Sequence, residues 1–305
     1  GVPVQLLANI NLLTDAVLAA ELQCNGVGLY RTEFPFIVRT TFPSEAEQFV
    51  IYSRLVQSMP GKPVTFRTLD AGGDKILSYY HDVQEQNPAM GMRSIRFSLQ
   101  NRPIFREQVR AILRAGADAD LRIMFPMISS IDEFCQAREV VLESIDGLSR
   151  QGIAHNGKPK LGMMVELPSV VELIEDFAAE AEFFSIGTND FIQFMLGVDR
   201  TNDSVADFYL PHHPSVLRAL SRIVRAANGS KREVSVCGDM AHEPQYVPFL
   251  LGIGVRTLSV DPAYLLRTQQ TIAGMSIRQA EAMAQAMLAQ SRTHEIETIL
   301  GEPGT

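Results

Sequence analysis

Two acidic residues stand where short apolar runs end, and they are the first candidates for chemistry in this sequence. The run Leu161–Val165 stops at Glu166, and the run Phe183–Ile186 is followed closely by Asp190. A helical pattern over Ser169–Ala181 separates the runs, which predicts a strand, a helix and a strand. A right-handed crossover places two such strands side by side with the same polarity, so both carboxylates point into one space. Hard oxygen ligands with open positions beside them suit Mg²⁺ or Mn²⁺.

Other polar residues also lie at the ends of apolar runs. Arg31 follows the run GVGLY, Arg67 lies in the run VTFRT, Asn189 directly precedes Asp190, and Cys237 ends the run VSVC. Any one of these could be structural. Together, arginines facing two carboxylates predict a site for a small polyanion held with a divalent metal, because guanidinium groups bind phosphate and carboxylate bidentately.

The elements that must position these residues alternate along the chain. The eight apolar runs are Val4–Ile10, Val27–Tyr30, Val64–Thr68, Leu121–Phe125, Leu161–Val165, Phe183–Ile186, Val234–Cys237 and Thr257–Val260. Helical periodicity lies between them at Asp15–Leu22, Ser44–Met59, Arg106–Ala115, Asp132–Leu148, Ser169–Ala181, Ser215–Ala227 and Gln245–Leu251. This pattern predicts an α/β protein with a (β/α)₈ TIM-type barrel, and a doubly wound open sheet is the alternative. In such a barrel the carboxyl ends of the strands form the active face.

The segments outside this alternation carry further predictions. The connection Leu69–Asp120 contains AGGDK and NPAMGMRSIR, and a loop of that length is usually functional. Glycines Gly72, Gly73 and Gly91 allow backbone to approach a ligand, or they merely shape a long loop. The C-terminal segments Ile277–Leu288 and Thr293–Ile299 are helical and close the barrel or pack against a partner.

Composition limits the class of protein. With 305 residues, 46% of them hydrophobic and 20% charged, residues 1–305 can form one barrel-sized domain. The net charge of -8 argues against a nucleic-acid surface, although a local arginine cluster can still bind an anion. Three cysteines without paired spacing imply neither a disulfide framework nor a zinc site. No membrane span or leader is expected, so the predicted location is cytoplasmic.

A set of motifs in fixed order resembles one known family. The motifs are GVGLYRTEF, RTLDAGGDK, NPAMGMRSIR, IMFPMI, GMMVELPS, FFSIGTNDFIQFMLGVDR and SVCGDMA, from about Ala8 to Leu258. They are similar to the phosphoenolpyruvate (PEP)-binding domain of Enzyme I of the phosphotransferase system, whose superfamily includes pyruvate phosphate dikinase and PEP synthase. YRTEFPF and TFPSEAEQ look most like the Enzyme I branch, with the sugar and nitrogen-regulatory forms both open.

The resemblance implies a role for each matching residue. Glu166 and Asp190 would hold Mg²⁺, Asn189 would donate to the substrate, and Cys237 would protonate C3 of the enolate. The arginines implied to bind the phosphate and carboxylate of PEP are Arg31, Arg67, Arg93 and Arg200, of which Arg93 is also counted as catalytic. Arginines and a metal suit phosphoryl transfer, which needs mainly positioning and charge neutralisation.

A few residues depart from the family or stay outside its site. Asp239 stands where a glutamate is usual and His242 where a glycine is usual, which puts the rate of the proton donation and the rigidity of that loop in doubt. His212 and His213 are adjacent and flanked by prolines. That arrangement is more typical of a rigid loop than of a metal pair.

The resemblance also implies partners. Enzyme I is phosphorylated on a histidine of a separate N-terminal domain, and none of the six histidines here lies in that context. We therefore expect the catalytic half of an enzyme that transfers phosphoryl to that histidine, then to a histidine phosphocarrier protein, and that forms a homodimer. One alternative is a PEP-sensing dimerisation module without turnover. Another is a Mg²⁺-dependent aldolase or lyase acting on a pyruvate enolate, which would not need so many arginines.

Overall fold

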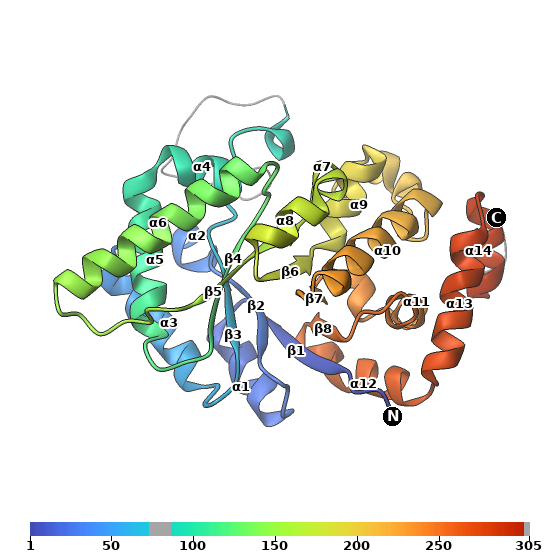
Figure 1. Ribbon diagram of the computed structural model, residues 1–305, viewed down its shortest axis with the longest axis horizontal. Coiled ribbons are helices and arrows are strands. Elements are labelled where there is room, and N and C mark those ends of the chain that lie inside the picture. The colour runs from blue at the N-terminus through green and yellow to red at the C-terminus, as the bar shows by residue number, and fades with distance from the viewer. Residues whose placement is uncertain (73–86, 302–305) are drawn as a thin grey trace. The chain divides into compact units, whose positions relative to one another are not determined.

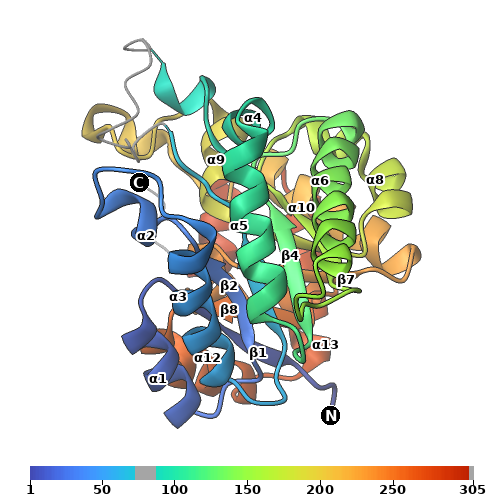
Figure 2. The same ribbon diagram turned by 90° about the vertical axis from the view of Figure 1, so that its left-hand side faces the viewer.

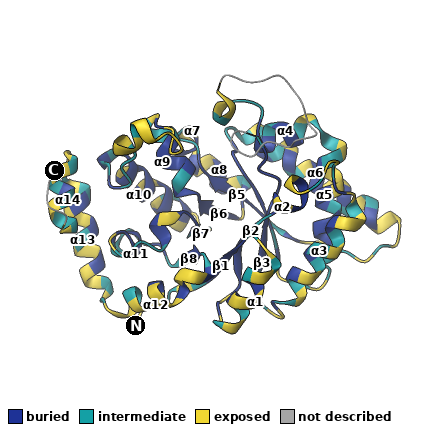
Figure 3. Cartoon of the chain, turned by 180° about the vertical axis from the view of Figure 1, so that it is seen from behind, coloured by how far each residue is buried: buried dark blue, intermediate teal, exposed yellow. Residues whose placement is uncertain are grey.

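The computed structural model describes residues 1–72 and 87–301. Its eight parallel strands are hydrogen-bonded neighbours in chain order and form a closed barrel, so the predicted (β/α)₈ architecture is confirmed and the open sheet is wrong. The strands are β1 Gln5–Ile10, β2 Val27–Arg31, β3 Val64–Arg67, β4 Leu121–Phe125, β5 Lys160–Val165, β6 Phe183–Ile186, β7 Glu233–Val236 and β8 Thr257–Val260. Figure 3 shows that these strands are mostly buried, while the outward faces of the helices are exposed.

The chain divides into two compact units. The N-terminal unit comprises residues 8–164, and the C-terminal unit comprises residues 1–7 and 165–305. Every predicted strand is present, and the observed ends differ only slightly from the predicted ones. Cys237 therefore lies directly after β7 rather than in it.

Helices of the N-terminal unit pack on the outside of its strands. They are α1 Leu13–Glu21, α2 Phe34–Ile37, α3 Glu45–Gln57, α4 Ser94–Gln100, α5 Arg102–Ala115 and α6 Ile131–Arg150, with the 3₁₀ helix η1 at Pro88–Met90. Figure 2 shows α3, α5 and α6 as neighbours, and α5 packs against both of the others. Edge-to-face contacts join Tyr30, Tyr52 and Phe66 at centroid distances of 5.2–5.9 Å, which fixes α3 over β2 and β3.

Helices of the C-terminal unit continue to the end of the chain. They are α7 Ser169–Glu172, α8 Ile174–Glu180, α9 Thr188–Leu196, α10 Pro214–Gly229, α11 Val247–Gly252, α12 Leu265–Ala273, α13 Ile277–Ala289 and α14 Thr293–Leu300, with η2 Asp203–Phe208, η3 Asp239–Ala241 and η4 Pro262–Tyr264. Figure 1 shows α11 beside α13, and α13 leading into α14. A Cβ at Gly252 of α11 would lie 2.1 Å from the carbonyl oxygen of Ala280 in α13, so this close packing requires glycine.

Helix predictions were less accurate than strand predictions. The predicted helix Ser169–Ala181 is divided into α7 and α8 at Leu173. The ψ of Leu173 is 15°, outside the helical range, so α7 ends before this residue. Helix α9 was not predicted, because its first residues Thr188 to Asp190 looked like a polar loop after a strand. An acidic residue in the first turn of a helix suits the positive end of the helix dipole. Asp190 is therefore as compatible with the start of a helix as with a polar loop.

The remaining predictions for the chain ends and the long connection have mixed outcomes. The two predicted C-terminal helices are confirmed as α13 and α14. In the long connection Gly72 is described, whereas Gly73 of AGGDK lies outside the described residues. Within residues 1–72 and 87–301, no helix combines the length and the apolarity needed to cross a membrane.

Candidate functional site

Two of the predicted arginines lie at the carboxyl ends of adjacent strands in the N-terminal unit. Arg31 of β2 and Arg67 of β3 are register partners. Arg31 Nη1 donates to Asn11 Oδ1 at 3.0 Å, which directs its guanidinium across the end of β1. Arg67 is buried, so its charge requires partners within the protein.

Two buried carboxylates supply those partners, and neither was predicted from the sequence. Glu33 Oε1 lies 2.5 Å from Arg67 Nη2, and Asp70 Oδ2 lies 3.2 Å from Arg67 Nη1. Asp70 Oδ1 is also 3.0 Å from Arg93 Nη2, so one carboxylate bridges two arginines. The available signal was their position in the motifs RTEF and RTLD, directly after β2 and β3. If Arg31 is counted with Arg67 and Arg93, three guanidinium charges stand against the two carboxylate charges of Glu33 and Asp70. The sum over these five side chains is +1, which suits an anion.

The position of Arg93 depends on a close backbone contact. Gly72 has a φ of +110°, and a Cβ there would lie 2.4 Å from Arg93 Cβ, so only glycine fits. Ser94 N donates to Ala71 O at 2.8 Å, and Ser94 Oγ donates to Asp70. Leu69 and Ala71 belong to a buried apolar cluster with Phe36 of α2 and Phe97 of α4. This small core therefore anchors both segments that carry the arginines.

Helix α5 contributes a polar side chain that fixes the strand ends. Gln108 Nε2 donates to Thr32 Oγ1 at 3.1 Å, and Gln108 Oε1 accepts from Leu69 N at 2.9 Å. Thr32 Oγ1 in turn donates to Arg67 O at 2.9 Å. These buried bonds hold the backbone from Arg67 to Leu69 in place.

Both predicted metal ligands lie in the C-terminal unit, directly beyond adjacent strands. Glu166 follows β5 and is 1% exposed, and Asp190 lies in the first turn of α9 and is 8% exposed. A hydrogen bond of 3.1 Å from Gly187 N to Val165 O joins the two strand ends. Arg200 Nη2 lies 3.4 Å from Asp190 Oδ1, so the fourth predicted arginine is placed beside one of the carboxylates.

The donor set at these two residues fits a hard divalent cation. Carboxylate oxygens are the ligands that Mg²⁺ and Mn²⁺ prefer, and Mg²⁺ is usually bound by one or two carboxylates with water and phosphate oxygens. Within the described part of the chain, no group of three or more acidic, histidine or cysteine residues could hold a metal by itself. A cation at Glu166 and Asp190 would therefore need oxygen atoms from a ligand or water.

Asn189 and Cys237 are joined by the loop that follows β7. Cys237 is buried, and its thiol donates to Ile186 O at 3.6 Å. Asp239 N donates to Asn189 Oδ1 at 2.8 Å, which orients the Asn189 amide nitrogen as the end that can donate. A Cβ at Gly238 would lie 2.0 Å from Thr188 Oγ1, so glycine is required for this approach.

Tyr209 was not selected from the sequence, although it contacts the same loop. Its hydroxyl donates to Asn189 O at 3.2 Å. Burial raises the pKa of Tyr209; Arg200 opposes that rise, while Asp239 and Asp190 add to it. The hydroxyl therefore stays protonated and remains a donor.

The residues that depart from the family pattern have clear contacts. The His242 ring stacks on the Tyr264 ring with centroids 3.9 Å apart and an interplanar angle of 4°, which joins the loop after β7 to the loop after β8. Burial lowers the pKa of His242, although Asp239 and Asp261 raise it, so the stacked ring is neutral at pH 7. The stack on Tyr264 thus stabilises the loop after β7 at His242, the residue that put the rigidity of this loop in doubt.

The adjacent histidines have separate partners. His212 is buried between Tyr246 and Glu297, with its ring nitrogens 3.2 Å from the hydroxyl of the first and from Oε1 of the second. His213 Nδ1 instead accepts from Ser215 N at 3.2 Å and caps α10. The two rings therefore have separate roles in local structure.

Comparisons with known proteins place these features in context. A family model described as "PEP-utilising enzyme, PEP-binding domain" matches residues 1–277. Relatives named phosphoenolpyruvate-protein phosphotransferase are 41% identical over 296 residues in Geobacillus stearothermophilus and 40% identical over 302 residues in Bacillus subtilis (strain 168). The alignments cover 97% and 99% of this chain but 51% and 53% of the relatives, so the chain spans about half their length.

Solved structures support the fold. An HpcH/Hpal aldolase/citrate lyase family protein from Burkholderia cenocepacia matches with a TM-score of 0.55 at 16% identity, covering 90% of this chain and 94% of that one. At this identity the likeness bears on the barrel alone.

The contact at Gly238 leads to a stability prediction. Gly238→Ala should destabilise the protein by about 1–3 kcal/mol, because the new methyl group would meet the buried Thr188 at the start of α9. Thermal unfolding followed by circular dichroism measures this as a lower Tm. Gly229→Ala, at a helical position with open space around it, is the matched control and should show no loss. Equal Tm values for the two variants would contradict the role of Gly238.

Proposed function

The chain belongs to the family of PEP-utilising enzymes, and we propose that it is the PEP-binding catalytic domain of a phosphoenolpyruvate-protein phosphotransferase. The proposed reaction is the Mg²⁺-dependent transfer of the PEP phosphoryl group to a histidine on a separate domain, with release of pyruvate. The observation that carries the proposal is the buried group in which Asp70 bridges Arg67 and Arg93, because it presents two guanidinium groups that are already oriented.

The arginines of the N-terminal unit are proposed to bind the phosphate and carboxylate of PEP. Glu33 and Asp70 hold Arg67 in one direction, so little side-chain freedom is lost when a ligand binds. Arg31 adds a third guanidinium at the end of β2. Arg93 counts as catalytic in this proposal, because charge on the transferred phosphoryl group must be neutralised in the transition state.

The C-terminal unit is proposed to supply the remaining groups. A Mg²⁺ or Mn²⁺ ion held by Glu166 and Asp190 would provide positive charge beside the phosphate and enolate oxygens. Arg200 is proposed to bind the ligand from beside Asp190, and the Asn189 amide to donate to it.

Cys237 is the proposed acid of the reaction. When the bond between phosphorus and the enol oxygen breaks, its electron pair stays on pyruvate as the enolate. The Cys237 thiol then gives its proton to C3 of the enolate, and the resulting thiolate regains a proton from solvent. Burial of the thiol beside Ile186 O keeps it oriented and limits access by water.

A homodimer is proposed from an exposed apolar patch on α2. Phe34, Ile37 and Val38 are 49%, 44% and 59% exposed, although Phe36 between them is buried. A contiguous apolar patch on a protein surface is typical of a protein–protein interaction site. We further propose that the acceptor histidine belongs to an N-terminal domain that serves a histidine phosphocarrier protein. The proposed location is the cytoplasm, where the three free cysteines would stay reduced.

The metal assignment is tested by calorimetric titration of PEP with and without Mg²⁺. In the wild-type protein Mg²⁺ should raise the affinity, whereas Glu166→Gln and Asp190→Asn should each lose most of that gain, because each removes one charged oxygen ligand. The exposed acid Glu172 of α7, paired with Arg222 of α10, provides the control Glu172→Gln, which should keep the gain in affinity. Wild-type metal dependence in either site variant would remove that residue from the metal site.

The role of Cys237 is tested by separating binding from turnover. Cys237→Ala should bind PEP like the wild type but form free pyruvate on the order of 10²-fold more slowly when a histidine-bearing domain is supplied, because the enolate lacks its acid. Cys135→Ala is the control, since Cys135 lies on α6 and outside the proposed site. Normal pyruvate formation by Cys237→Ala would refute the assignment. Tight PEP binding without any transfer by the wild type would favour the sensing module.

The dimer is tested by sedimentation equilibrium. The wild-type chain should have the mass of a dimer, and Phe34→Asp or Ile37→Asp should shift it to a monomer, because a charge on the apolar patch would have to be desolvated in the interface. Leu142→Asp places the same charge on an exposed leucine of α6 and should leave the dimer intact. A wild-type monomer, or dimeric patch variants, would rule out this interface.

A further inference from the structure

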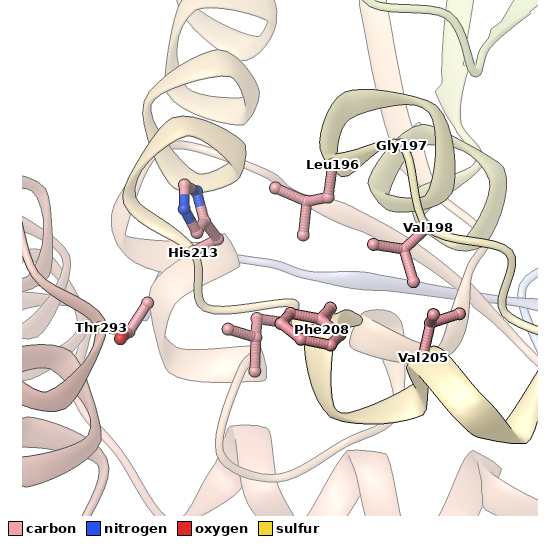
Figure 4. A pocket seen from close by; sticks show the side chains of 8 residues that line it. Leu196, Gly197, Val198, Val205, Phe208, His213 and Thr293 are labelled. Carbon is pink, nitrogen blue, oxygen red and sulfur yellow. The ribbon is translucent and has the colours of Figure 1, made fainter.

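The C-terminal unit contains a pocket of about 590 Å³ that includes none of the residues assigned to the reaction. It lies among the end of α9, the helix η2, the residue that caps α10 and the first residue of α14 (Figure 4). Leu196, Val198, Val205 and Phe208 give it apolar walls. Pockets of several hundred Å³ with mostly apolar walls and a few polar groups are typical sites for small ligands.

Two lining residues, His213 and Thr293, carry polar side chains. In Figure 4 they lie on one side of the pocket, and Val198 and Val205 lie on the other. A ligand that fills this pocket would therefore need one polar end and one apolar end.

The hydrogen bonds of His213 decide which polar end fits. His213 Nδ1 lies 3.2 Å from Ser215 N and 2.8 Å from Ser215 Oγ. The backbone N–H of Ser215 can only donate, so Nδ1 accepts and a neutral ring carries its proton on Nε2. Burial and the neighbouring His212 lower the pKa of His213, which keeps the ring neutral at pH 7. Thr293 adds a hydroxyl group on the first residue of α14, where the helix dipole favours negative charge. A hydrogen-bond acceptor with negative charge matches both groups.

We propose that this pocket binds a small carboxylate with an aromatic or branched apolar body. The carboxylate would accept from His213 Nε2 and from the Thr293 hydroxyl. The apolar body would lie against Val198, Val205 and Phe208. Phe208 is 65% exposed, so the ligand would also cover apolar surface that now faces solvent.

The pocket shares one chain segment, residues 196–210, with the proposed site. Arg200 on this segment lies 3.4 Å from Asp190, and its backbone N–H donates to Gln193 Oε1 at 3.1 Å. Tyr209, beside Phe208, donates to Asn189 O. A ligand in the pocket would bias the conformation of this segment and so change PEP affinity, a consequence that rests on the proposed function. By linkage, PEP would change the affinity for the pocket ligand by the same factor.

The probe is 3-phenylpropionate, titrated calorimetrically into the full chain without PEP. We expect saturable binding with a dissociation constant on the order of 1 mM or tighter. The matched alcohol, 3-phenylpropanol, should bind at least about tenfold more weakly, because it lacks the charged acceptor. This titration tests the pocket whether or not the chain binds PEP.

Variants identify the site of binding. His213→Asn keeps a side-chain acceptor for Ser215 N but removes the Nε2 donor, and Val205→Trp fills the pocket; both should weaken binding at least about tenfold. Asp207→Ala, at an exposed position of η2, should bind the probe like the wild type.

The sequence contains no tryptophan, so Phe208→Trp provides a single fluorescent reporter. Its emission should shift to the blue as the probe binds, and the titration should give the same dissociation constant as calorimetry.

Several outcomes would overturn the proposal. These are the absence of saturable binding to the wild type, and full binding by both His213→Asn and Val205→Trp. Probe binding that disappears as the protein concentration rises would show that a second copy covers the pocket instead. If the probe binds and PEP binds, but neither changes the affinity for the other, the coupling through residues 196–210 is wrong. A failure of PEP binding alone would count against the proposed function and not against the pocket.

Discussion

The buried carboxylate of Asp70 is the group on which the candidate site of the N-terminal unit depends. It faces the guanidinium groups of Arg67 and Arg93, and Glu33 holds Arg67 as well. Each of these charges would be costly if it were buried alone, because lost hydration is offset only by well-placed partners. The same pairing orients both arginines in advance, and with Arg31 the three guanidinium charges exceed the two carboxylate charges by one. In the proposed function, PEP would bind to these arginines with little rearrangement of the protein.

The C-terminal unit positions its candidate residues by close backbone contacts more than by ion pairs. Gly238 lets the loop after β7 approach Thr188, and the bond from Asp239 N to Asn189 Oδ1 joins that loop to α9. Cys237 directly precedes this contact, so the proposed acid and the proposed substrate-binding amide are placed together. The stack of His242 on Tyr264 holds the other end of the loop. A histidine at this position thus contributes a contact that a glycine could not make.

Residues 196–210 have two roles in this interpretation. Arg200 and Tyr209 contact Asp190 and Asn189, whereas Val205 and Phe208 line the separate apolar pocket. A segment that contacts both the pocket and the candidate site offers a physical route for coupling, provided that each ligand favours one arrangement of it. Fold similarity to lyases does not bear on this point, because barrels of one architecture support unrelated reactions.

The sequence by itself determined the strands, the barrel and the strand-end positions of Arg31, Arg67, Glu166 and Asp190, because alternation and burial of apolar runs are local properties. It did not reveal helix α9, whose polar first turn resembles a loop, or the break at Leu173. Glu33 and Asp70 were also missed: Glu33 is 34 residues from Arg67 and Asp70 is 23 residues from Arg93, although Asp70 is only three residues from Arg67. Only the tertiary structure decided these partners, because the energy of a buried charge depends on which distant groups the fold brings beside it.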